Sequence, residues 1–319
     1  MSVSTKIVQK MALQVQSGDS YEEDAMSLLP VLSGRIKQTP SLIEDESYTG
    51  NAFRDIPQRG TISVEGTISF QIDPVSLIPI LEATLGDRSS GSSEVFLFTK
   101  HTKKLSVIMY DGVYTNKYAN VYIKRFKING SADNKLTGEV DVLGVTEEVR
   151  ESGDTFPSFT ENSDFFHFHE ASSNGYLRVG DQSDTLTSSD EIEFDDFSIE
   201  MVTGFDSQFC NKVYSLRPVF GMSAPSVTGS FKISRYENDS FLDFSLNLTR
   251  LQANLLFYKS SSETIKFEIP NFIVNADLSD DDVTRIACEM TVGRNGIGSN
   301  YKNVNMAFTS PIRVTTEAS

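Results

Sequence analysis

The sequence predicts a mainly β protein of two tandem β-sandwich or barrel domains, each with one short α-helix and long loops. Three observations support this fold class: apolar and polar residues alternate along several segments, helical patterns are few, and the order of the elements recurs in the second half. The length of 319 residues also suggests about two domains. We place the first domain at residues 1–150, a linker at 151–163 and the second domain at 164–319.

The first half opens with a polar segment and continues into a strand and a helix. Residues 18–60 form this polar segment, and a connection of that length inside a compact domain is usually functional. Residues 61–70 alternate apolar and polar side chains, which predicts a strand. Residues 73–86 predict a short helix, because Asp73 or Ser76 can cap its start and a single apolar stripe follows.

A hairpin follows, and the same order of elements returns in the second half. Residues 121–128 and 136–142 both alternate and flank a polar turn, which is typical of a β-hairpin. The first of these strands matches residues 267–275 at an offset of 146, so we interpret the chain as a duplicated domain. The repeated elements are strands at 226–233, 267–275 and 285–293, with a short helix from about Ser240 whose pattern also fits a strand.

Acidic residues are unevenly distributed along the chain. The net charge is −16, of which residues 1–150 carry −3 and residues 151–319 carry −13. A protein that binds nucleic acid needs a row of basic residues to neutralise phosphates, and neither half has one. The charge therefore argues against DNA or RNA binding and leaves open a role in which repelling polyanions is useful. No segment approaches the ~20 apolar residues of a membrane-spanning helix.

Residues that carry chemistry are scarce. His167 and His169 would share one face of a strand, but no Cys or third His lies nearby to complete a metal site. Cys210 and Cys288 lack the local spacing of a redox or zinc motif, and we interpret them as buried or inert thiols. No nucleophile elbow, P-loop or dinucleotide fingerprint occurs. We therefore predict no enzyme activity, no metal site and no cofactor.

Three features follow one another in the first half. Residues 41–48 form a Ser-hydrophobic-acidic segment, residues 60–70 form a strand with Gly at both its start and its middle, and the next helix ends in Leu85-Gly86. This order of features resembles the bacteriophage tail tube proteins, or major tail proteins, and the internal repeat extends the resemblance to a second, duplicated tube domain.

The resemblance implies a structural role. Tail tube domains close six-fold into rings through a continuous inner β-barrel, and stacked rings form the conduit for viral DNA. A chain with two such domains would form homotrimeric rings with pseudo-six-fold symmetry. The long loop, Ser41 to Arg59, would reach a neighbouring subunit or the next ring, and the second copy has a shorter segment at 206–217. The candidate contact residues of the long loop are Tyr48, Phe53, Arg54 and Ile56.

Partners and a location also follow from the resemblance. The implied partners are further copies of the chain, the tape measure protein, the tail terminator and distal tail proteins, and viral DNA in transit without specific binding; no membrane is implied. We expect the protein in the virion tail, assembled in the cytoplasm of the bacterial host.

Acidic side chains of the barrel strands are candidates for the wall of the lumen. DNA carries about one negative charge per 1.7 Å of axis, so basic side chains in the lumen would hold it and acidic ones would repel it. An equally open interpretation is that these residues only solvate the outside. The candidates are Glu65, Glu139, Asp141, Glu268 and Glu289.

Two other functions stay open at this point. A β-sandwich viral adhesin or carbohydrate-binding module fits the fold class, although without Trp it would depend on its 11 Tyr residues for aromatic platforms. A hydrolase with paired carboxylates ranks last, because such sites usually sit in a cleft lined with aromatic residues.

Overall fold

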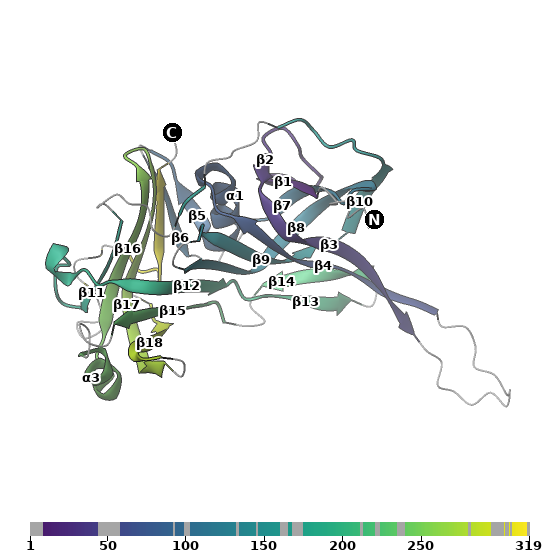
Figure 1. Ribbon diagram of the computed structural model, residues 1–319. Helices are drawn as coiled ribbons and strands as arrows, with labels where there is room; N and C mark the ends of the chain where they lie inside the picture. The colour runs from purple at the N-terminus through teal and green to yellow at the C-terminus, as the bar shows by residue number, and fades with distance from the viewer. Residues whose placement is uncertain are drawn as a thin grey trace, which may run out of the picture.

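The computed structural model shows a protein made mainly of antiparallel strands, as predicted (Figure 1). The structure describes residues 9–43, 58–91, 93–98, 103–131, 134–144, 146–159, 165–167, 175–210, 213–220, 224–234, 240–279, 282–294, 303, 306 and 308–317.

The elements divide between the two halves of the chain. Those of the first half are β1 (Lys10–Val15), β2 (Ser27–Leu29), β3 (Val31–Ile43), β4 (Gln58–Gln71), α1 (Pro74–Leu85), β5 (Gly86–Ser89), β6 (Glu94–Phe98), β7 (Leu105–Tyr110), β8 (Tyr114–Ser131), β9 (Thr137–Gly144) and β10 (Thr146–Ser152). Those of the second half are β11 (Tyr176–Asp181), the short 3₁₀ helix η1 (Ser188–Asp190), β12 (Phe194–Val202), β13 (Phe205–Cys210), β14 (Val213–Phe220), β15 (Ser226–Ser234), α3 (Ser240–Asn247), β16 (Leu251–Ser260), β17 (Glu263–Ser279), β18 (Asp282–Val292) and β19 (Arg313–Glu317).

Strands from both halves form one continuous sheet, which we call the main sheet. Its antiparallel order is β3–β4–β9–β8–β12–β15–β18–β17. The two halves meet where β8 pairs with β12, with Lys127 opposite Glu200 and Ile128 opposite Ile199. We call this pairing the inner joint.

Two smaller sheets pack against the main sheet and share its longest strands. The first part of β8 belongs to the order β2–β1–β7–β8–β10, and the first part of β17 belongs to the order β11–β16–β17–β19–β6–β5. Apolar side chains between these layers form the core. Tyr118 of β8 is buried there, and its hydroxyl donates to the Ile36 carbonyl of β3 at 3.3 Å.

Both halves use the same strand order. In the main sheet, β3–β4–β9–β8 corresponds to β12–β15–β18–β17, and in the smaller sheets β1–β7–β8–β10 corresponds to β11–β16–β17–β19. A helix follows the second main-sheet strand of each half, α1 in the first and α3 in the second. The β5–β6 hairpin departs from this correspondence, because it belongs to the first half yet pairs with β19, with Leu97 opposite Arg313.

Helix α1 forms where the sequence predicts it. Asp73 caps its start, since one carboxylate oxygen accepts backbone N–H bonds from Val75 and Ser76, both at 3.0 Å. Gly86 ends the helix with a φ of 90°, in the left-handed region that favours glycine. Strands β1, β2, β5, β6 and β8 pack around α1, so nearly all of its residues are buried.

Helix α3 begins at the predicted residue, and the alternative of a strand there is not observed. Phe241 is its buried residue and packs edge-on against Phe231 of β15, with ring centroids 5.7 Å apart. Leu246 and Leu248, at the end of the helix and just beyond it, are 83% and 66% exposed. In Figure 1, α3 lies at the outer end of the second half.

Each predicted strand segment lies within an observed strand to within one residue, although β4, β8, β17 and β18 extend further than predicted. One expectation about loops is wrong. The polar segment 18–60 is not a single loop, because β2, β3 and the start of β4 lie within it. In the central part of β3, Ile36 is buried while Arg35 and Lys37 are exposed, which made the segment look like a polar connection. β10 ends at Ser152, inside the expected linker. The contact candidates Tyr48, Phe53, Arg54 and Ile56 lie outside the described residues.

Candidate functional site

The main sheet has one buried face and one exposed, polar face. Along β4, Val64 and Ile68 point into the core, whereas Glu65 and Thr67 are exposed, as the period of a strand requires. The neighbouring strands alternate in the same way. Two open grooves, of about 900 Å³ and 560 Å³, are lined largely by side chains of this polar face.

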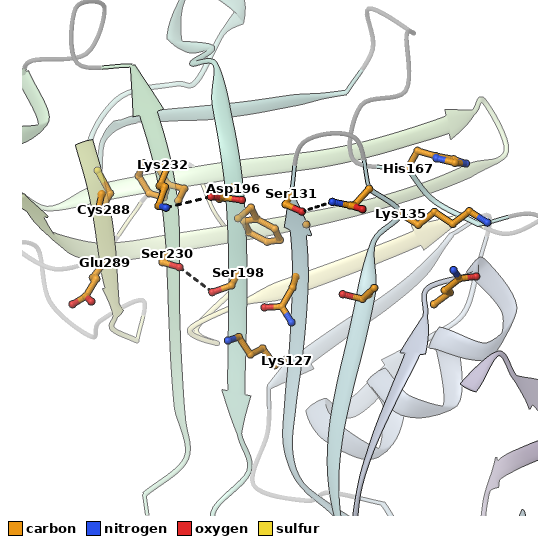
Figure 2. A pocket seen from close by; sticks show the side chains of 18 of the residues that line it. Lys127, Ser131, Lys135, His167, Asp196, Ser198, Ser230, Lys232, Cys288 and Glu289 are labelled. Carbon is orange, nitrogen blue, oxygen red and sulfur yellow. Dashed lines mark hydrogen bonds and ion pairs between the residues drawn. The ribbon is translucent and has the colours of Figure 1, made fainter. Parts of the chain in front are cut away.

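The larger groove crosses the inner joint and continues over β15 and β18 (Figure 2). Lys232 lies 3.5 Å from an Asp196 carboxylate oxygen, and the hydroxyls of Ser198 and Ser230 lie 3.0 Å apart. These groups come from adjacent strands and bind one another. Within the part of the chain that the structure describes, no group of three or more His, Cys, Asp or Glu residues could hold a metal ion.

Arg125 of β8 holds the inner joint together. Its guanidinium pairs with three carboxylates, two on the neighbouring strand β9 and one across the joint on β12. Nε lies 2.6 Å from Asp141 and Nη1 lies 3.1 Å from Glu200, while Nη2 pairs with Glu139. Because the side chains are only partly exposed and one cation serves several anions, this cluster forms a network rather than an isolated surface pair.

The electrostatics of this cluster keep Asp141 ionised. Partial burial acts to raise the pKa of the Asp141 carboxyl, but hydrogen bonds from Arg125 and Thr67 outweigh it, so the pKa lies below the ordinary value of 3.8. The Asp141 carboxylate is therefore charged at neutral pH.

A buried threonine closes one end of the inner joint. Thr203 follows the last residue of β12, and its hydroxyl donates to the Ile123 carbonyl of β8 at 2.7 Å. Its backbone N–H donates to the Lys124 carbonyl at 3.0 Å. These two bonds extend the strand pairing beyond the end of β12.

The outer strands of the main sheet have unpaired sides. Among the residues that the structure describes, no strand pairs with the outer side of β3 or with that of the last part of β17, residues 273–279. Arg35 and Lys37 are exposed on β3, and Asn275 and Asp277 are exposed on β17. We call these two sides the β3 edge and the β17 edge.

Two backbone N–H groups along the β17 edge donate hydrogen bonds to side chains. The N–H of Ala276 donates to the Ser245 hydroxyl of α3 at 3.1 Å, and the N–H of Leu278 donates to the Asp277 carboxylate at 2.8 Å. A helix and a charged side chain are common protections for a strand edge that would otherwise pair with another chain.

Four of the five acidic candidates lie together on the polar face, and the fifth does not. Glu65, Glu139, Asp141 and Glu289 alternate with core residues on neighbouring strands of the main sheet. Glu268 is buried in the first part of β17, where it pairs with Lys266 at 3.0 Å and with Arg313 of β19.

The polar face carries basic side chains as well as acidic ones. Sequence reasoning considered only acidic side chains and missed the basic ones, although they occupy the same alternating positions and this spacing is visible in the sequence. The basic residues of the face are Arg35, Lys37, Arg125, Lys127, Lys232 and Arg285. Further acidic residues of the face are Asp196, Glu200 and Asp277, and Asp195, at the bulge of β12, pairs with Arg285 at 2.8 Å.

The thiols and histidines do not form a reactive centre among the described side chains. Cys288 is a free, buried thiol whose pKa burial raises to about 12, so it stays protonated. His167 is exposed, and its backbone bridges to Lys135. The Cys210 side chain and His169 lie outside what the structure describes. None of the described helices has the length and apolar character needed to cross a bilayer.

Comparison with known proteins agrees with the architecture. A family model described as a phage tail tube protein matches residues 10–292, a range that contains every strand of the main sheet. Comparison with individual curated proteins found no match.

Proposed function

The chain belongs to the phage tail tube protein family, and on that premise we propose that its copies close into rings that stack to form the conduit for the viral genome. Membership of this family makes the protein a structural component of the virion tail. The inner joint is the observation that carries the proposal, because it joins two halves of equal strand order edge to edge.

The two strands with unpaired edges, β3 and β17, correspond to the two strands that pair at the inner joint. β3 occupies in the first half the position that β12 occupies in the second, and β17 corresponds in the same way to β8. A second copy that lays its β3 along the β17 of the first would repeat the inner joint between chains. Because this contact is heterologous, repetition closes a ring if the rotation per chain divides the circle.

This reasoning supports a duplicated tube domain and a ring of three chains. Two units per chain and six units per ring give a homotrimer with pseudo-six-fold symmetry. The units meet alternately at inner joints and at joints between chains. The polar face of the main sheet would then line the lumen, with Glu65, Glu139, Asp141 and Glu289 among its side chains.

The helices supply a second, independent reason to expect a neighbour. α1 contacts strands of the second half, β17 and β19, as well as those of its own half. The corresponding surface of α3 faces no second unit, and Leu246 and Leu248 are left exposed there. A ring would cover them, because the next chain would contact α3 in the way that the second half contacts α1.

The remaining partners follow from the place of a tube in a tail. We propose contacts with the tape measure protein inside the tube and with the tail terminator and distal tail proteins at its ends. Viral DNA passes without specific binding, and no catalysis is involved. Tyr48, Phe53, Arg54 and Ile56 are proposed to contact a neighbouring chain or ring, after assembly in the host cytoplasm.

Electron microscopy of the purified full chain tests the proposal. We expect rings or stacked rings with an open centre, and image classes with three-fold or pseudo-six-fold symmetry. Chains that remain monomeric at high concentration, in all conditions tried, would contradict it.

A variant pair makes the test specific to the joint between chains. Leu246→Glu combined with Leu248→Glu changes only exposed side chains, so the monomer should keep its thermal stability while ring formation is lost. Val75→Glu on α1 is the matched control, since Val75 is 50% exposed and α1 already contacts both halves. Equal assembly of all three proteins would exclude α3 from the joint.

A further inference from the structure

We infer that the joint between chains has the opposite charge polarity to the inner joint, which fixes the order in which edges pair. This inference rests on the proposed ring. Inside the chain, the β8 side of the joint is basic and the β12 side is acidic. Between chains, the β17 side is acidic and the β3 side of the next chain is basic.

The inner joint shows its polarity directly. Lys127 of β8 lies opposite Glu200 of β12, and Arg125 reaches the same glutamate at 3.1 Å. Asp196 of β12 lies four pairs further along, opposite Ser131 and on the same face. Each charged residue of β8 at this joint is therefore basic and each of β12 on the polar face is acidic.

Strand register identifies the counterparts on the β3 edge. Ile36 lies opposite Gly66 in the first half, and Ile199 lies opposite Gly229 in the second. The differences 199 − 36 and 229 − 66 are both 163, so β3 and β4 map onto β12 and β15 with one shift. Lys37 is thus the counterpart of Glu200.

The same reasoning identifies the counterparts on the β17 edge. Gly66 lies opposite Val142 and Gly229 lies opposite Met290, which maps β9 onto β18 with a shift of 148. Phe126 pairs with Val140 of β9, and Ala276 pairs with Cys288 of β18, so β8 maps onto β17 with a shift of 150 (276 − 126). Lys127 therefore corresponds to Asp277.

The joint between chains consequently places Asp277 opposite Lys37 of the next chain. This is the pair Lys127–Glu200 with its charges exchanged. Arg35 adds a second positive charge to the β3 edge, and Glu289, beside Asn275 on β18, adds a negative charge near the β17 edge. Cross-strand pairs of opposite charge stabilise antiparallel strands, and like charges directly opposite destabilise them.

This exchange of polarity disfavours each incorrect pairing. If the β3 edges of two chains paired, Lys37 of one chain would lie near Arg35 and Lys37 of the other. If two β17 edges paired, the Asp277 residues of the two chains would lie near each other. A β17 edge on a foreign β12 would oppose Asp277 to Glu200, and a foreign β8 on β3 would oppose Lys127 to Lys37. Like charges that face each other destabilise the wrong pairings. Charge complementarity therefore contributes more to the choice of partner than to the affinity of the correct pairing. Chains therefore join head to tail, with the two units alternating.

Formation of this joint would also break the two hydrogen bonds that now protect the β17 edge. The carboxylate of Asp277 now accepts the N–H of Leu278, and the Ser245 hydroxyl accepts that of Ala276. An incoming β3 would supply backbone carbonyls in their place. The Asp277 side chain then becomes available for Lys37.

Charge reversal tests the pairing. We compare the wild-type chain with Lys37→Glu, Asp277→Lys and the double variant, using sedimentation velocity at low and high salt and negative-stain microscopy. Each single variant should weaken ring formation about tenfold at low salt, while the double variant should recover it to within about threefold. Lys232→Glu is the control, because it makes the same charge change on the polar face away from both edges.

The outcomes separate this inference from the proposed function. If the wild-type chain forms rings and the single variants do so equally well, or the double variant is no better than either, the charge pairing is wrong and the ring stands. If the wild-type chain forms no rings, the proposed function fails and this inference fails with it. Unfolding temperatures of the monomers must agree, so that loss of rings reports the joint and not the fold.

Discussion

The two helices follow corresponding strands, yet α1 is buried and α3 is largely exposed. α1 lies between strands of its own half and contacts β17 and β19 of the other half, whereas the main contact of α3 is with β17 alone. Part of the difference lies in β2, β5 and β6, which pack on α1 and have no counterpart in the strand order described for the second half. The exposed side of α3 is the reason why we propose that a second chain packs against it.

Truncation of a leucine on each helix is the strongest test of this comparison. Leu81→Ala empties a fully buried site in α1, and we expect a loss of about 3 kcal/mol in the free energy of unfolding. Leu246→Ala, at an 83% exposed position, should change it by less than about 0.5 kcal/mol in the monomer. Urea denaturation measures both. A comparable loss at Leu246 would mean that α3 is already covered in the free chain.

One pair of core positions that differs between the two halves can be exchanged. Phe70 lies opposite Gly138 in the first half, and a Cβ at Gly138 would come within 2.3 Å of the Phe70 ring. The second half places Ile233 opposite Ile286. We expect Gly138→Ile to cost about 2 kcal/mol by overpacking.

The double variant Phe70→Ile with Gly138→Ile recreates the pair of the second half. Phe70→Ile alone should cost about 1–2 kcal/mol through the space it leaves. The double variant should be more stable than the sum of the single effects predicts, as a double-mutant cycle from thermal unfolding would show. Strict additivity would indicate that the halves do not share one packing scheme.

A buried carboxylate distinguishes the smaller sheets of the two halves. Glu268 pairs with Arg313 at the start of β19, whereas Ala119 lies opposite Thr146 at the start of β10. Burial acts to raise the pKa of Glu268, but the hydrogen bond from Arg313 and the charge of Lys266 outweigh it and hold the pKa below 4.5.

The pH dependence follows from the sign of that shift. The stabilisation from Glu268 is complete above pH 4.5 and is lost as the pH falls through the folded-state pKa. Glu268→Gln should therefore be about 1.5 kcal/mol less stable than wild type at pH 7, and the gap should close in acid. Thermal unfolding between pH 3 and pH 7 measures the gap, and a gap independent of pH would exclude the ionised carboxylate as its cause.

The smallest expected effect concerns the end of the inner joint. Thr203→Val removes the hydroxyl that donates to the Ile123 carbonyl and should cost about 1 kcal/mol. Its counterpart on the β3 edge is Pro40, which has no N–H to extend the pairing. Thr39→Val, at an exposed residue of β3, is the control and should be neutral. Equal effects of the two changes would show that the bond at Thr203 adds nothing.

Local signals were enough to predict helices α1 and α3 and six of the strands. Asp73 and Gly86 mark the ends of α1 by capping chemistry that acts within one turn. The period-two pattern likewise identifies β4, because each of its side chains reports the face on which it lies.

Pairing between distant strands could not be predicted in the same way. A period of two is unchanged by a shift of four residues, so the sequence match between β8 and β17 gave 146 where the strand register gives 150. The pattern also failed to show that Glu268 lies where β17 runs between β16 and β19, and that the network around Arg125 joins the two halves.

The β5–β6 hairpin affects the order in which the chain can fold during synthesis. β6 pairs with β19, with Glu94 opposite Thr316, so a strand made early waits for one made near the end of the sequence. Contacts between distant residues form slowly, because the intervening chain must first be brought together. The first half therefore cannot complete its fold before β19 has been made, and a polypeptide that lacks β19 exposes the side of β6 that β19 should occupy.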